Sequence, residues 1–139
     1  MALQTRVLCV PFVPVLGAKA RNLAMLNDLA VRIAASADKP DIVVSEAALA
    51  EGELAEIATM LAASGVTAHT EWVIGLPLRE GGEIYNCAVV FRGGEVKHIH
   101  RKLFLPTYGM FDEARYFARG TALTTFKGVL GKTALLICE

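Results

Sequence analysis

The chain has 139 residues, 54% of them hydrophobic, which fits one domain with a substantial core and excludes a mainly disordered protein. Fourteen Lys and Arg residues balance fourteen Asp and Glu residues, so no net charge attracts nucleic acid or an anionic membrane, and we expect neither as a partner. The three cysteines lack a Cys-x-x-Cys spacing. This argues against a disulfide framework and a zinc site, and favours the reducing cytoplasm.

An apolar run from Val7 to Ala18 opens the chain after Arg6. The run also resembles a secretory signal, because small residues flank Lys19 as they would at a cleavage site. Pro11 and Pro14 interrupt it and only one positive charge precedes it, so we favour a buried first strand that leads into a loop. The run is too short to span a bilayer.

Hydrophobic periodicity then predicts helices and strands in alternation. Apolar side chains recur at helical spacing over about residues 19–36 and again over 54–61, where Gly65 closes the pattern. Apolar, β-branched runs predict strands at 41–46 and 72–76. This order favours an α/β layer architecture.

The second half of the chain combines strands with a long aromatic segment. The runs 84–91 and 95–100 flank Arg92-Gly93-Gly94 and predict a hairpin. Residues 102–120 lose periodicity but are rich in aromatic and charged side chains, which is typical of an ordered functional loop. Residues 133–138 are an apolar run that predicts a last strand.

That last strand bears on the domain organisation. A fully apolar strand lies inside a sheet and under a covering layer, whereas only Glu139 follows it here. We therefore expect residues 1–139 to be one domain, without linker or repeat, cut just after this strand.

Two short motifs imitate known sites. Gly128–Thr133 resembles the end of a phosphate-binding loop, but Phe126 occupies the first glycine position and a strand is predicted to follow. His98 and His100 share one strand face, yet no carboxylate set completes a metal site, so packing or surface roles are favoured.

Three ionisable residues stand at or near predicted strand ends: Glu46, Lys102 and Cys138. Ligands of open α/β sheets collect outside the carboxyl ends of strands, so these residues can converge. A free thiol has a pKa of about 8.5 and needs a base or a positive charge to act as a nucleophile. Glu46 can be that base and Lys102 that charge.

Four segments follow one another along the chain: Asp41–Glu46, the Tyr-Asn-x-Ala strand Tyr85–Phe91, His100–Pro106 and Leu135–Glu139. In this order they resemble the carbon–nitrogen hydrolases of the nitrilase superfamily, whose catalytic set is glutamate, lysine and cysteine. Ser45 departs from the proline that usually precedes the glutamate in that family. Together with Tyr108–Phe117 they are most similar to the branch that contains the glutaminase domain of glutamine-dependent NAD synthetase.

The resemblance implies roles for these residues. Glu46 would be the base, Cys138 the nucleophile and Lys102, with the backbone N–H of Glu139, the stabiliser of negative charge. Glu113 would assist Lys102, although the adjacent Asp112 is an alternative. Tyr108 would contact substrate. Cys9 and Cys87 are expected to pack in strands.

The implied fold is the N-terminal half of a four-layer α-β-β-α sandwich, which forms a homo-oligomer when full length. No metal or organic cofactor is required. The expected reaction is hydrolysis of a small amide or nitrile through a cysteine thioester, with the 139-residue chain inactive alone. Two alternatives stay open: a glutaminase module that supplies ammonia to a downstream NAD synthetase domain, and a non-catalytic fragment.

Overall fold

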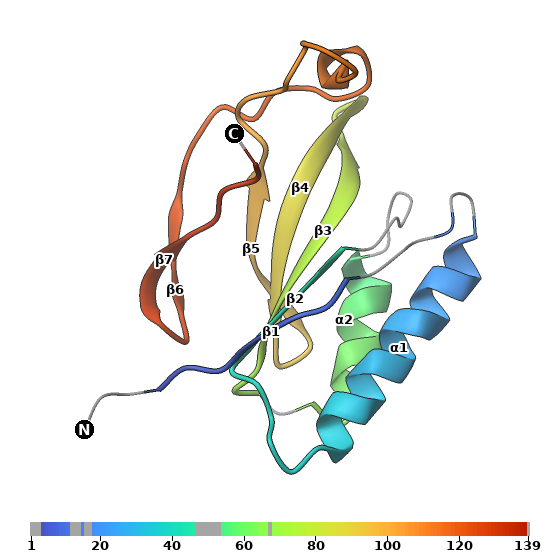
Figure 1. Ribbon diagram of the computed structural model, residues 1–139, viewed down its shortest axis with the longest axis vertical. Coiled ribbons are helices and arrows are strands. Elements are labelled where there is room, and N and C mark those ends of the chain that lie inside the picture. Colours follow the sequence, from blue (N-terminus) through green and yellow to red (C-terminus); the bar gives the residue numbers. More distant parts are fainter. Residues whose placement is uncertain (1–3, 12–14, 16–17, 47–53, 67, 139) are drawn as a thin grey trace.

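The computed structural model describes residues 4–11, 15, 18–46, 54–66 and 68–138, with the backbone alone at residue 46. Within them the chain forms two α-helices, seven strands and one short 3-10 helix, η1 (Figure 1). Their bounds are β1 Val7–Cys9, α1 Lys19–Ala35, β2 Ile42–Glu46, α2 Leu54–Ala63, β3 Glu71–Glu80, β4 Glu83–Arg92, β5 Glu95–Arg101, η1 Glu113–Arg115, β6 Thr125–Gly128 and β7 Gly131–Ala134.

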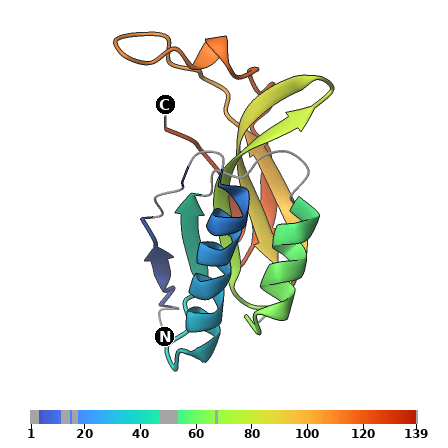
Figure 2. The ribbon, with the colours of Figure 1, turned by 90° about the vertical axis from the view of Figure 1, so that its right-hand side faces the viewer.

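The five strands β1 to β5 form one sheet in chain order. The pairs β1–β2 and β2–β3 are parallel, and the pairs β3–β4 and β4–β5 are antiparallel. The helices α1 and α2 pack side by side on one face of this sheet, whereas the separate β6–β7 hairpin lies on the other side (Figures 1 and 2). The sheet is therefore the middle layer of the described structure.

The main core fills the space between the two helices and the sheet. Leu26 and Ile57 contribute fully buried side chains from the helices, and Trp72 and Phe91, which are cross-strand partners, contribute the largest ones from the sheet. Burial of each such side chain stabilises the fold by about 1.5–3 kcal/mol. The helical periodicity of residues 19–36 and 54–61 thus marks the faces that the structure buries.

The β4–β5 hairpin is confirmed, with Gly93 and Gly94 both at positive φ (61° and 77°) in its two-residue turn. Positive φ at both central positions is the geometry of a type I′ turn, which suits the twist of the flanking strands.

The strand expected at 72–76 is longer than predicted, because β3 continues through Pro77 to Glu80. Pro77 is paired with Asn86, whose carbonyl oxygen accepts a hydrogen bond from the far side, from the N–H of Lys102 at 2.8 Å. In an antiparallel pair of strands, hydrogen-bonded and non-hydrogen-bonded residue pairs alternate. Since the carbonyl of Asn86 points away from β3, Pro77 and Asn86 form a non-hydrogen-bonded pair, and β4 requires no N–H from Pro77.

The first strand is shorter and less buried than expected. The strand β1 covers only Val7–Cys9, at the sheet edge, and Val7 is 54% exposed. Its one strand neighbour in the described sheet is β2, so its side chains lack the cover that a central strand receives. Cys9, expected to be packed in a strand, is exposed instead.

The strand expected at 133–138 is also misplaced. The strand β7 ends at Ala134, paired with Thr125 of β6 across a turn in which Gly131 has a φ of 92°. The next residue that would pair, Thr124, lies outside the ladder with its hydroxyl 3.5 Å from Nε2 of His98. Residues 135–138 therefore continue without strand structure.

No helix in the described part of the chain combines the length and the apolar character needed to cross a bilayer.

Candidate active site

The segment between Lys102 and Gly120 leaves and rejoins the sheet at the same place. The N–H of Lys102 donates to the carbonyl of Asn86 at 2.8 Å, and that of Ala118 donates to the carbonyl of Ile84, also on β4, at 2.7 Å. The N–H of Gly120 closes the loop onto the carbonyl of Lys102 at 2.8 Å. These backbone bonds fix Lys102 at the base of the loop, and they confirm that residues 102–120 form an ordered segment.

Lys102 is a buried cation. Its side chain is 3% exposed, and its Nζ lies 2.9 Å from Oε1 of Glu113. The other oxygen of Glu113, Oε2, is buried and lacks a hydrogen-bond partner among the residues that the structure describes. Withdrawing a charge from water costs several kcal/mol unless a counter-charge is close, so this contact compensates for the burial of Lys102.

The geometry distinguishes Glu113 from Asp112. Glu113 begins η1, and its N–H donates to the carbonyl of Pro106 at 3.1 Å, which turns the loop back over Lys102. Asp112 is exposed and its side chain makes no cap hydrogen bond to η1. Glu113 is therefore the carboxylate that contacts Lys102.

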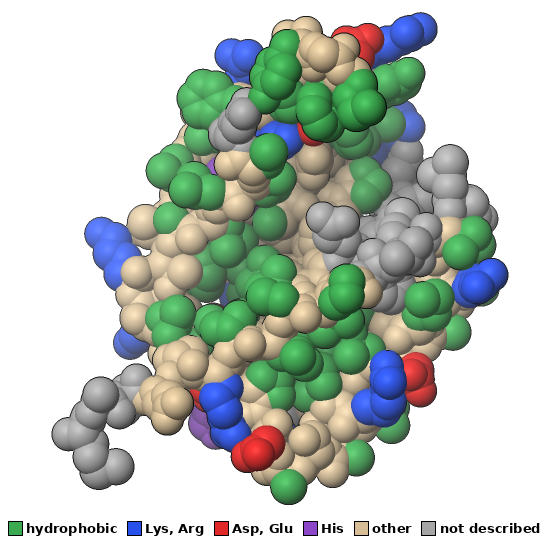
Figure 3. Space-filling view, viewed as in Figure 1, with side chains coloured by type: hydrophobic (Ala, Val, Ile, Leu, Met, Phe, Trp, Pro, Cys, Tyr) green, Lys and Arg blue, Asp and Glu red, His purple; other side chains and the backbone are tan. Residues whose placement is uncertain are grey.

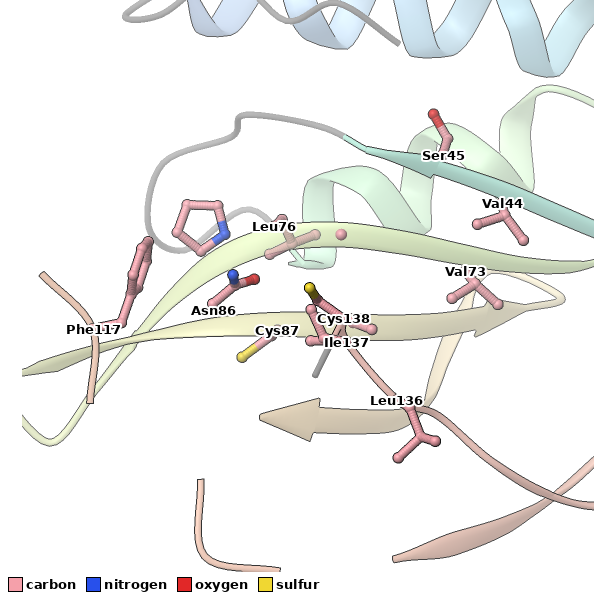
Figure 4. A pocket seen from close by; sticks show the side chains of 13 residues that line it. Val44, Ser45, Val73, Leu76, Asn86, Cys87, Phe117, Leu136, Ile137 and Cys138 are labelled. Carbon is pink, nitrogen blue, oxygen red and sulfur yellow. The ribbon is translucent and has the colours of Figure 1, made fainter. Parts of the chain in front are cut away.

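Cys138 lies on the wall of an open cavity of about 470 Å³ (Figure 4). The cavity is lined by the strands β2 to β4 and the C-terminal residues 136–138. This C-terminal segment lies on the side of the sheet away from the helices (Figure 1). The other lining residues are mostly apolar: Val44, Ser45, Val73, Gly75, Leu76, Pro77, Asn86, Cys87, Ala88, Phe117, Leu136 and Ile137.

The backbone and exposure of Cys138 set it apart from a packed thiol. It is exposed, and among the described residues other than glycine it is the one with a positive φ, 53°. A left-handed conformation costs an L-residue about 1–2 kcal/mol, and such strain is concentrated at functional sites. Cys138 is therefore not a buried, packed thiol.

Cys87 lines the same cavity but differs chemically from Cys138. It is fully buried, and burial raises the pKa of its thiol to about 11. Asn86 and Cys87 are adjacent and leave β4 in different directions (Figure 4). Since the thiolate is the nucleophilic form, Cys87 is a packing residue beside the cavity.

Two further candidates fall outside the described side chains. The backbone of Glu46 ends β2 and is paired with Gly75, which lines the cavity, but the side chain of Glu46 is not described. Glu139 lies outside the described residues altogether. Their roles stay predictions.

Tyr108 is not among the described residues that line the cavity. It is 56% exposed and packs edge-to-face with Phe111, with ring centroids 6.1 Å apart. Apolar side chains gather over this loop at the top of the molecule (Figure 3). A contact between Tyr108 and substrate therefore stays a prediction.

Asn86 and Phe117 connect the buried ion pair to the cavity, and the sequence assigned a role to neither. Asn86 lines the cavity and also holds the backbone of Lys102. Phe117 lines the cavity, and its N–H donates to the carbonyl of Glu113 at 2.9 Å. Both belong to the segments of the resemblance, but only the fold shows that they share one wall.

Comparison with known proteins identifies the family. The family model described as carbon-nitrogen hydrolase matches residues 30–139. The chain belongs to the carbon-nitrogen hydrolase family. The matched region includes Lys102, Glu113 and Cys138, so the cavity and the buried ion pair lie within the family's own domain.

Individual relatives agree with the expected branch. A glutamine-dependent NAD(+) synthetase from Xanthomonas campestris pv. campestris is 35% identical over 103 residues, which cover 71% of this chain and 18% of that relative. The solved structure of glutamine-dependent NAD+ synthetase from Acinetobacter baumannii superimposes with a TM-score of 0.74 at 25% identity, over 96% of this chain and 27% of that one. The chain thus spans a minor part of these relatives.

The fold prediction is also confirmed. A member of branch 10 of the nitrilase superfamily from Saccharomyces cerevisiae superimposes with a TM-score of 0.67 at 19% identity, over 96% of this chain and 55% of that one. At this identity the likeness concerns the fold alone. The α/β fold is of the nitrilase type, and the helices and five-stranded sheet of the described residues are consistent with the expected N-terminal half of the four-layer α-β-β-α sandwich.

Proposed function

We propose that this chain carries the nucleophile of an amide hydrolase, with Cys138 attacking the carbonyl carbon of a small carboxamide. The observation that supports it is the position of Cys138. Cys138 is exposed, has a left-handed backbone conformation and lines the cavity. Asn86 lines the same cavity, and its backbone carbonyl holds the buried cation Lys102.

In the proposed acylation step, Glu46 takes the thiol proton as the Cys138 sulfur forms a bond to the carbonyl carbon. The carbonyl oxygen gains negative charge, which Lys102 and the N–H of Glu139 stabilise. The carbon–nitrogen bond then breaks, and the nitrogen leaves as ammonia with the proton held by Glu46. A thioester on Cys138 remains.

In the proposed deacylation step, Glu46 takes a proton from water while the water oxygen attacks the thioester carbon. The carbon–sulfur bond breaks, the sulfur regains the proton, and the carboxylic acid is released. Glu113 acts as a positioning residue, because its contact with Nζ of Lys102 fixes the position of that cation.

Thiol reactivity tests the assignment of the nucleophile. We expect iodoacetamide to modify Cys138 at least about tenfold faster than Cys9, because both thiols are exposed but only Cys138 has the proposed base and cation beside it. The variants Cys9→Ser and Cys138→Ser identify each site by mass spectrometry. Equal rates at the two cysteines would contradict the proposal.

Hydrolysis tests the reaction itself. With the complete gene product, we expect ammonia release from primary amides and a thioester adduct on Cys138 that acid quenching traps. Cys138→Ser should abolish both, whereas Cys9→Ser should leave both unchanged. Full ammonia release by Cys138→Ser would refute the mechanism.

The relatives favour glutaminase activity as a second, more specific candidate. Curated relatives that match the chain are glutamine-dependent NAD(+) synthetases, such as those of Xanthomonas campestris and Thermotoga maritima. In this version the amide is the side chain of glutamine, and the ammonia passes to a synthetase domain. A kcat/KM for glutamine well above that for simple amides and nitriles would support the glutaminase activity. Equal kcat/KM values for glutamine and simple amides would favour a free-standing amidase.

We further propose that the complete protein is a cytoplasmic homo-oligomer that interacts with a small-molecule amide. Sedimentation of the complete gene product tests the oligomeric state, and a monomer at micromolar concentration would contradict it.

A further inference from the structure

Asn86 is a polar side chain on a mostly apolar cavity wall. Its carboxamide lies on the wall that also carries Cys138 (Figure 4). Its register partner is Pro77, and Ala88, two residues further along the same strand, also lines the cavity. Within the part of the chain that the structure describes, nothing is hydrogen-bonded to this carboxamide. The few polar groups of an apolar site are those that orient a ligand.

A carboxamide presents one acceptor, Oδ1, and one N–H₂ donor group, Nδ2. A primary amide presents the complementary pair, an N–H₂ donor group and a carbonyl acceptor. An ester has no N–H, and neither has a nitrile, so Oδ1 would lose its partner against either. The carboxamide of Asn86, unpaired among the described residues, therefore matches a primary amide better than an ester or a nitrile.

We propose that Asn86 is a specificity-determining residue that selects primary amides over esters and nitriles by accepting a hydrogen bond from the substrate N–H₂ group. This inference rests on the function proposed above and specifies its substrate class. It leaves the bond-making steps unchanged, since Asn86 binds and orients the amide while the Cys138 sulfur attacks.

The backbone of Asn86 makes a clean test possible. The hydrogen bond that fixes Lys102 uses the carbonyl oxygen of Asn86, which any substitution retains. Asn86→Leu replaces the carboxamide with an apolar group of similar size. The variant therefore removes the proposed substrate contact and keeps the anchor of the cation.

The experiment measures kcat/KM of the complete gene product for a primary amide and for the methyl ester of the same acid. We expect Asn86→Leu to lower kcat/KM about tenfold for the amide and by less than about twofold for the ester, as loss of one hydrogen bond predicts. Phe117→Leu is the matched control, because Phe117 lines the same cavity without a hydrogen-bonding side chain. It should change both substrates in parallel.

An equal loss on both substrates in Asn86→Leu, or an amide-specific loss in Phe117→Leu, would overturn the inference. Failure of the underlying function has a different signature. Cys138→Ser would then keep its activity on both substrates, whatever the Asn86 variants do.

Discussion

The ammonium group of Lys102 and the carboxylate of Glu113 are 2.9 Å apart, although the two residues are eleven positions apart in the chain. The contact forms because residues 102–120 start and finish at the edge of β4, so the loop folds back over its own first residue. A buried cation with a fixed counter-ion is a preorganised source of positive charge, and the backbone of Lys102 is bonded to Asn86, which lines the cavity.

Removal of the Glu113 charge should therefore affect both stability and activity. Glu113→Gln leaves Lys102 buried without a counter-charge, and we expect the free energy of unfolding to fall by about 2–3 kcal/mol. In the complete gene product we expect kcat to fall about tenfold or more with a smaller change in KM, because the cation loses its position rather than its contact with bound substrate.

Asp112→Asn is the matched control for that experiment. Asp112 is the neighbouring carboxylate but is exposed, so its loss should change the free energy of unfolding by less than about 0.5 kcal/mol. Urea titration of both variants measures the difference. If Asp112→Asn were as damaging as Glu113→Gln, the assignment of the counter-ion would be wrong.

Gly120 closes the loop at a point where no side chain fits. A Cβ atom on this buried glycine would overlap the carbonyl oxygen of Arg101, the residue before Lys102. We expect Gly120→Ala to destabilise the fold by about 2–3 kcal/mol and to displace Lys102. Thermal unfolding and the kcat of the complete gene product measure the two effects.

Gly109, on the same loop, provides a comparison. It has a φ of 62°, but a Cβ there would have no atom within 4 Å. Gly109→Ala should therefore cost only about 1 kcal/mol, from backbone strain alone. Equal losses in the two variants would mean that the close approach to Arg101 does not exclude a side chain at position 120.

The sequence predicted elements that rest on local signals. The helix expected at residues 19–36 is α1, Lys19–Ala35, because its apolar spacing is set within one element. The hairpin turn at Gly93 and Gly94 follows from the need for positive φ. Lys102 and Glu113 were identified through the family motif, and the structure brings them into contact.

The strand boundaries that were predicted wrongly depend on contacts between residues that are distant in the chain. The strand expected at 72–76 continues through Pro77, and the sheet tolerates this proline because the carbonyl of Asn86, its partner, bonds to Lys102 on the other side. The strand expected at 133–138 looked continuous by hydropathy, yet its pairing ends where Thr124 turns toward His98. Neither contact leaves a local pattern in the sequence.

The buried thiol of Cys87 should make the fold sensitive to alkali. Burial raises the pKa of this thiol from 9.0 to about 11 in the folded protein. Between these values the unfolded chain loses the proton while the folded one keeps it, so the folded state binds more protons and stability falls as the pH rises. We expect Cys87→Ala to show a shallower loss of unfolding free energy between pH 8.5 and 10.5, by on the order of 1 kcal/mol.

Cys9→Ala is the control in the same pH series, because Cys9 is exposed. Its curve should run parallel to that of the unmodified protein. A Cys87→Ala curve that also ran parallel would show that the thiol titrates equally in the folded and unfolded states. Urea midpoints at each pH provide the measurement.

Acid should weaken the contact between β5 and the β6–β7 hairpin. The ring of His98 stacks on Phe126 of β6 with centroids 4.7 Å apart, and desolvation lowers the pKa of His98. Desolvation, and then the nearby His98, lower the pKa of the buried His100. The unfolded chain therefore takes up protons first as the pH falls through the usual histidine range, and stability decreases toward pH 5.

We expect His98→Gln to show a smaller difference in unfolding free energy between pH 7.5 and pH 5 than the unmodified protein, whereas the exposed His69→Gln should retain the full difference. Urea titrations at the two pH values measure this, and an unchanged difference in His98→Gln would exclude a role for its protonation.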